Sequence, residues 1–85
     1  MPTPVVALNH AVAVAMVSGP AAGLELLDKP WLAKELSTYQ HYHSARGELL
    51  STVDPVAAKD ALGKALSLAT NPAERRLLKK KIREI

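Results

Sequence analysis

The stretch DPVAAKDALGKALSLATN, residues 54–71, decides the fold because it carries the marks of a single helix at both ends and along its length. Asp54 can cap the N-terminus, Pro55 suits the first helical position, and Asn71 before Pro72 marks the end of this helix and the start of another. Small and aliphatic residues recur at spacings of three and four: Ala58, Ala61, Leu62, Ala65, Leu66 and Ala69. So small a stripe lets a neighbouring helix approach closely, which predicts the second helix of a packed hairpin.

Composition limits what this chain can be. The 85 residues make one domain, 1–85, and a chain of this length buries about 60 to 65% of its unfolded surface. Hydrophobic residues make up 48% and aromatic residues 4%, with no Phe, so the core must consist of Ala, Val and Leu. Such a core favours close helix contacts over a ligand pocket. We expect a protein that is not an enzyme and that binds no cofactor.

Two compositional features bear on location. There is no Cys, which excludes disulfides and thiolate metal sites. The N-terminal residues 1–17 are apolar but lack a basic leader, and Asn9 and His10 interrupt a run that is too short to span a bilayer. This segment is therefore expected to form a core helix of a cytoplasmic protein.

Turn and cap residues divide the chain into five expected helices. The first follows Thr3 and Pro4, and Ser18 with Gly19 ends it, while Ser37 or Thr38 is expected to cap the third. The expected helices span residues 4–17, 21–28, 38–52, 54–71 and 72–84. Residues 31–36 could form a short helical turn or an irregular connection.

The two hairpins show a degenerate internal repeat. The matching pairs are Ala11 with Gly47, 36 residues apart, and Gly23 with Ala58 and Leu27 with Leu62, each 35 apart. This period is close to the roughly 34 residues of a tetratricopeptide repeat. Small residues are expected where the helices of each hairpin cross, Ala11 with Gly23 and Gly47 with Ala58. The expected fold is all-α, with two tetratricopeptide-like hairpins and a C-terminal capping helix.

Three strings carry a resemblance to a known family. They are ALNHAVAVAMVSGPAAGLELLD at 7–28, YHSARGELL at 42–50 and KALSLATNPAERRLLKKKI at 64–82. In this order they resemble the C-terminal extension of a group of extracytoplasmic-function RNA polymerase sigma factors that end in a tetratricopeptide-like domain. His10 stands where that group usually has Arg. The sigma domains that bind polymerase and promoter lie upstream in that group.

The resemblance implies a regulatory, protein-binding role in transcription initiation. The expected partners are upstream sigma domains of the same chain, RNA polymerase, or both, with no membrane or small molecule, and DNA contact by this domain is not expected. A free-standing helical scaffold, forming a homodimer, is the alternative.

Apolar and polar positions on the first helix of each hairpin are the candidate partner interface. In a tetratricopeptide hairpin the first helix lines the concave side, and the register set by Ala11 places Val5, Leu8 and Val12 there. The corresponding polar residues of the second hairpin are His41, Ser44, Glu48 and Ser51. We expect the apolar half to contact a partner or a second copy, and the polar half to face solvent.

Basic residues gather in the last expected helix. Residues 1–71 contain five Lys and Arg and six Asp and Glu, a net charge of −1. Residues 72–85 contain six Lys and Arg and two Asp and Glu, a net charge of +4. The candidate basic face consists of Arg75, Arg76, Lys79, Lys80 and Arg83, to which Lys81 is adjacent. Clustered cations can neutralise the phosphates of a nucleic acid. We prefer the explanation that these residues form the solvent-exposed face of a capping helix.

Other candidate sites fail on geometry. His41 and His43 point about 200° apart on a helix, so they are expected to be surface or groove side chains and not metal ligands. A catalytic set with Ser44 as nucleophile, His43 as base and Glu48 as the residue that orients the base is not expected. Ser44 and His43 are adjacent on the helix, so they cannot form the hydrogen bond that activates a nucleophile. The aromatic residues are expected to fill the space between hairpins, although an exposed Trp31 would indicate partner binding: Trp31, Tyr39 and Tyr42.

Overall fold

The computed structural model describes residues 3–85, and this range is all-α, without strands. Its helices are α1 Pro4–Ser18, α2 Pro20–Leu27, α3 Pro30–Glu35, α4 Gln40–Leu50, α5 Pro55–Leu68 and α6 Pro72–Arg83. The expected helices are confirmed, with ends that differ by up to three residues. Of residues 31–36, for which the sequence allows a helical turn or an irregular connection, residues 31–35 lie in the short helix α3 and Leu36 is its C-cap.

Proline sets most helix starts. Among the described helices, α4 alone does not begin at a proline. The other five begin at Pro4, Pro20, Pro30, Pro55 and Pro72. The ring fixes φ near its helical value, and the missing N–H has no intrahelical partner at this position in any case. Proline therefore stops one helix and starts the next without loss of a hydrogen bond, and this keeps the connections short.

Three of the four side-chain caps expected from the sequence are confirmed. The Thr3 hydroxyl accepts a hydrogen bond from the N–H of Val6 at 3.2 Å, and the Asp54 carboxylate accepts one from Ala57 at 3.2 Å. The Asn71 side-chain oxygen accepts from the first turn of α6. Each cap satisfies a backbone donor that the helix leaves free, which stabilises that helix start by about 1 kcal/mol.

The start of α6 forms only half of a capping box. The Oδ1 atom of Asn71 accepts from the N–H groups of Ala73 at 2.9 Å and Glu74 at 3.1 Å. The Glu74 carboxylate accepts from Nε2 of Gln40 at 2.7 Å. Its bond is thus a tertiary one, which ties the start of α6 to the start of α4.

The expected cap of α4 is wrong. Neither Ser37 nor Thr38 caps the helix, which begins at Gln40 with Tyr39 in the N-cap position and no side-chain cap bond there. The carbonyl of Ser37 instead bonds the ring of His43 at 2.7 Å. This bond gives the Ser37 carbonyl a partner, and the start of α4 has no side-chain cap.

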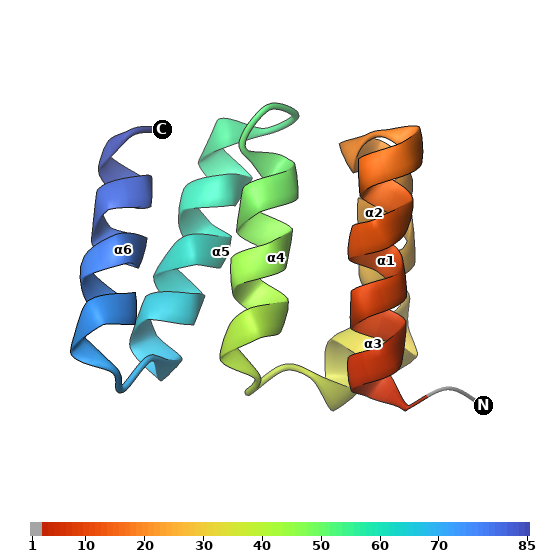
Figure 1. The fold of residues 1–85 in the computed structure, drawn as a ribbon, viewed down its shortest axis with the longest axis horizontal. Helices are drawn as coiled ribbons and strands as arrows, with labels where there is room; N and C mark the ends of the chain where they lie inside the picture. The colour runs from red at the N-terminus through yellow and green to blue at the C-terminus, as the bar shows by residue number, and fades with distance from the viewer. Residues whose placement is uncertain (1–2) are drawn as a thin grey trace.

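Figure 1 shows two helical hairpins side by side, α1 with α2 and α4 with α5, and α6 beyond α5. Helix α2 packs against α4, and α3 lies at one end of the first hairpin, where it contacts α1. The described termini lie at opposite ends of the array, which measures 34 by 25 by 18 Å. Apart from α3, which mainly contacts α1, each helix makes its largest contact with a neighbour in sequence, as in a repeat array.

The core forms three adjoining clusters. The first joins the two hairpins at α3, the second lies between α2, α4 and α5, and the third lies between α5 and α6. The small stripe of α5 is buried as expected, with Leu66 half-buried: Ala58, Ala61, Leu62, Ala65 and Ala69. No aromatic residue other than Tyr42 is fully buried among residues 3–85, so the packing relies on short aliphatic contacts.

The first hairpin crosses at Gly23. A Cβ atom on Gly23 would lie 2.6 Å from the Cβ of Ala15 and 2.9 Å from the carbonyl oxygen of Ala11. Only glycine fits this distance, so the expected approach of Ala11 and Gly23 is confirmed. The helices touch backbone to backbone because both sides present their smallest residues.

The second hairpin crosses at Gly47, but with a different partner. A Cβ on Gly47 would lie 2.6 Å from Cγ of Leu62, whereas Ala58 was the expected neighbour. Leu62 is 2% exposed and fills the gap that the glycine leaves. The larger residue reaches across because α5 presents it one turn further along than Ala58.

A pair of glycine variants tests this packing. Alanine favours a helix interior over glycine by about 1 kcal/mol, so Gly63→Ala, where a Cβ would meet no atom within 4 Å, should stabilise the protein by up to about 1 kcal/mol. At Gly23 the added methyl overpacks the crossing, which costs about 1 to 3 kcal/mol, so Gly23→Ala should destabilise. Urea unfolding measures both variants, and an equal stabilisation at the two positions would contradict the close crossing.

Candidate protein-interaction surfaces

The expected interface on the first helix is only partly accessible. Leu8 is 4% exposed and packs in the core with Ala11, so its assignment to a partner interface is wrong. Val12 is half-buried against the same cluster, and Val5 is 41% exposed. The side of α1 that carries Leu8 turns toward α2 and α4, since the core needs its longest aliphatic side chain there.

The exposed apolar surface of α1 lies on its opposite side. Val6 is 55% exposed, Met16 84% and Val17 88%, and Ala13 is also exposed. We call the exposed apolar residues of this helix the α1 apolar face: Val5, Val6, Ala13, Met16 and Val17. One signal for this face is present in the sequence: residues 4–17 are apolar on nearly all sides of a helix, whereas a helix at the protein surface usually has a polar side.

A cleft of about 420 Å³ adjoins the α1 apolar face at Val6. Its lining comes from α1, α2 and α3: Val6, Ala7, His10, Leu26, Lys29, Trp31 and Leu32. Trp31 is 37% exposed and lies on this outer side of the first hairpin, so the expectation that it fills the space between hairpins is wrong. Its exposure places Trp31 among the candidate partner-binding residues. Lys29 and His10 give the cleft a basic rim without a carboxylate.

The polar residues expected on α4 lie next to α6. His41 and Ser44 line a hollow of about 210 Å³ between α4 and α6, where Leu77 is half exposed. The Glu48 carboxylate pairs with the ammonium group of Lys81 from α6. The last helix therefore engages part of the expected polar interface.

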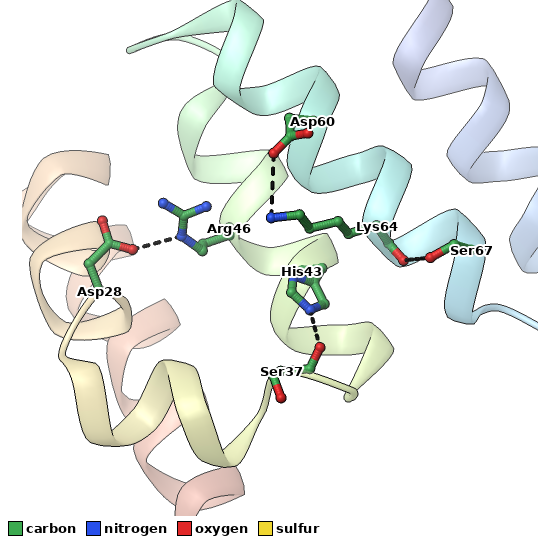
Figure 2. Close-up of polar contacts among 7 residues, drawn as sticks. All are labelled: Asp28, Ser37, His43, Arg46, Asp60, Lys64 and Ser67. Atoms are coloured by element: carbon green, nitrogen blue, oxygen red, sulfur yellow. Dashed lines mark hydrogen bonds and ion pairs between the residues drawn. The ribbon is translucent and has the colours of Figure 1, made fainter.

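Polar contacts join the two hairpins. Nε of Arg46 on α4 donates at 2.7 Å to the carboxylate of Asp28, the residue after α2 (Figure 2). The Tyr42 hydroxyl donates to the carbonyl of Leu27 at 2.7 Å. The hydrogen bond from Arg46 to Asp28 raises the pKa of Arg46, although burial opposes it. Burial raises the pKa of Tyr42 above its ordinary value, against the nearby charge of Arg46. These contacts fix α4 against α2.

The expected positions of the other two aromatic residues, Tyr39 and Tyr42, are confirmed. Tyr42 is 3% exposed in the cluster between the hairpins, and Tyr39 packs half-buried against that cluster. His41 is exposed, whereas His43 is 8% exposed, and its Nε2 bonds the Ser37 carbonyl. His43 is thus a structural histidine. Residues 3–85 contain no group of three His, Cys, Asp or Glu side chains that could hold a metal ion.

The basic residues of α6 divide into two kinds. Arg75 turns inward, and its guanidinium donates to the carbonyls of Leu66 at 2.9 Å and Ala69 at 3.0 Å. It thereby gives the Ala69 carbonyl a donor at the C-terminal end of α5 and the Leu66 carbonyl, which also accepts from the N–H of Ala69, a second one. Arg75 was expected on the outer basic face, so this assignment is wrong. The outer face keeps four exposed cations, of which Lys80 lies 3.9 Å from Glu84: Arg76, Lys79, Lys80 and Arg83.

The two kinds of arginine predict opposite outcomes. Arg75→Ala removes two charge-assisted hydrogen bonds to half-buried carbonyls and should destabilise the protein by about 1 to 2 kcal/mol. Arg76→Ala, one residue away and exposed, should change stability by less than about 0.5 kcal/mol. Thermal and urea unfolding measure both. Equal effects of the two variants would show that Arg75 does not cap α5.

Tyr42 predicts a loss of stability at high pH. Its pKa is raised in the folded state, so above pH about 10 the unfolded chain loses the hydroxyl proton more readily and unfolding becomes more favourable. Tyr42→Phe should cost about 1 kcal/mol at pH 8, because the Leu27 carbonyl loses its donor, and should lose less stability between pH 9 and 11 than the parent chain. Urea unfolding at these pH values tests this. Tyr39→Phe is the control, and a parallel decline in both variants would contradict the assignment.

No family model matches the chain, and no solved structure matches it. The chain is 43% identical over 74 residues to a protein of Rhizobium meliloti (strain 1021) named uncharacterized protein R00370. The match covers 86% of this chain and 17% of that protein, so the chain spans about a sixth of the length of this relative. Within residues 3–85, no helix is long and apolar enough to cross a membrane.

Proposed function

We propose that this chain is the regulatory, protein-binding C-terminal domain of an extracytoplasmic-function RNA polymerase sigma factor. It acts in the cytoplasm during transcription initiation, and it performs no catalysis. Its partners are the upstream sigma domains of the same polypeptide, RNA polymerase, or both.

The α1 apolar face carries the proposal. Exposed apolar patches on soluble proteins commonly mark interaction sites, and here two of the most exposed side chains, Met16 and Val17, are large and apolar. A binding partner that covers this face removes apolar area from water, which is the main favourable term in most protein association. The cleft beside Val6 and Trp31 extends this surface and offers a recess for an apolar side chain.

The sequence strings support a sigma-factor context, and the relative supports a place within a longer chain. The three strings that resemble the sigma-factor extension contribute to all helices except α3, so the resemblance concerns the array as a whole and not one motif. The match covers 17% of the Rhizobium meliloti relative, so a segment like this one occurs there within a longer protein, as the proposal requires.

A direct test starts from the native polypeptide. An antibody raised against this chain should detect a band several times larger than 9.1 kDa in the source cells. With that polypeptide and purified RNA polymerase core, transcription from its promoter should change when residues 3–85 are removed. The double variant Met16→Asp with Val17→Asp should reproduce that change, because charges on the α1 apolar face prevent its burial.

Lys59→Asp supplies the matched control, since Lys59 is exposed on α5, away from the α1 apolar face. It should leave transcription unchanged. A band at 9.1 kDa would overturn the proposal and leave the free-standing scaffold, for which the α1 apolar face would be the dimer contact. Unchanged transcription after removal of residues 3–85 would overturn the regulatory role alone.

A further inference from the structure

Matched positions of the two hairpins are buried alike, so one hairpin can be compared with the other, although the second crosses at Gly47 with Leu62 and not with Ala58. Ala11 and Gly47 occupy the same buried position on α1 and α4, 36 residues apart. The matching positions of α2 and α5, 35 apart, are also buried: Gly23 with Ala58 and Leu27 with Leu62. Subtracting 36 from the number of an α4 residue therefore gives the number of its counterpart on α1.

The side of α4 that faces the first hairpin is covered by α2. Tyr42 donates to the Leu27 carbonyl, Arg46 pairs with Asp28, and Cδ1 of Leu49 lies 3.0 Å from the Cβ position of Gly23. These three residues of α4 meet the last turns of α2 and the residue after it. Together they form the contact that joins one hairpin to the next.

The counterparts of these residues on α1 have no such cover. Tyr42, Arg46 and Leu49 correspond to Val6, His10 and Ala13. Tyr42 is 3% exposed and Val6 55%, and both other counterparts are exposed. Residues that form the inter-hairpin contact in the second hairpin thus face outward in the first.

The helices at the two ends of the array also differ in the polarity of their outer faces. Helix α6 turns exposed cations outward, as a terminal repeat with a polar outer face does: Arg76, Lys79, Lys80 and Arg83. Helix α1 turns valine, alanine and methionine outward at the other end. The array is therefore capped at its C-terminal end and uncapped at its N-terminal end.

We infer that the α1 apolar face seats the second helix of a further hairpin, supplied by the same polypeptide upstream of this segment. This inference rests on the proposed function, which places the segment in a longer chain. The added helix runs antiparallel to α1, as α2 does to α4, and its C-terminal end lies beside Val6 and His10.

The cleft next to Val6 defines the chemistry of that end. Lys29 and His10 form its basic rim, and Trp31 with Leu26 forms apolar wall. Asp28 occupies the equivalent place after α2, where it pairs with Arg46. The added helix accordingly ends in aliphatic side chains followed by a carboxylate residue, which lies within reach of His10 or Lys29.

Cysteine accessibility in the native polypeptide tests the inference, because residues 1–85 contain no Cys. Ala13→Cys and Val6→Cys place a thiol under the added helix, and Arg76→Cys places one on the outer face of α6 as the matched control. Alkylation by a maleimide is followed at each site by mass spectrometry of its peptide. We expect alkylation at residues 13 and 6 at least tenfold slower than at residue 76, at a rate independent of protein concentration.

The other outcomes each overturn the inference. Equal alkylation at residues 13 and 76 in a long polypeptide shows an open face, while the sigma-factor proposal stands. Protection that grows with protein concentration identifies a second copy as the occupant, and protection that appears only with RNA polymerase identifies the polymerase. A native polypeptide of 9.1 kDa removes the proposed function and this inference together, which the size measurement reveals before any alkylation.

Discussion

The close approach of helix backbones at glycine is the constraint on which the structure depends. At Gly23 the neighbouring helix lies so near that a single methyl group would meet Ala15 at 2.6 Å. With 4% aromatic residues the chain has few large side chains to span a wide gap, so helices must come together to exclude water. The short alanines of α5 serve the same end, because a stripe without long side chains lets α4 and α6 approach.

Close apolar packing alone does not fix how one hairpin sits on the next, since burial of aliphatic surface is non-directional. The direction comes from hydrogen bonds at the junction. Tyr42 and Arg46 donate to groups at the end of α2, and His43 bonds the Ser37 carbonyl from the other side of the turn. These bonds are short, at 2.7 Å, and Tyr42 is buried, so a displaced α4 would leave polar groups without partners.

The fold could be predicted from the sequence because its signals are local. Proline, cap residues and the alanine stripe set helix starts and buried faces without reference to distant contacts. Tertiary contacts decided the rest. Arg75 reaches back to the end of α5, and Ser37 serves His43 and not its own helix. The exposure of the candidate interface residues could be predicted only in part for the same reason: a helix that is apolar on nearly all sides does not show which side packs in the core, and that side carries Leu8.

The contrast between the two ends of the array shows why exposed apolar area on α1 is not incidental. A helix at the end of the array that always faces water gains no stability from exposed valine and methionine side chains. At the other end of the array, α6 exposes arginine and lysine side chains to solvent. Since the hairpins are otherwise built alike, the difference follows position in the array and not composition of the repeat. The α1 residues that lie bare are the counterparts of those that α4 uses against α2. This correspondence, position by position, with the residues that α4 buries against α2 is why we propose a neighbouring helix there.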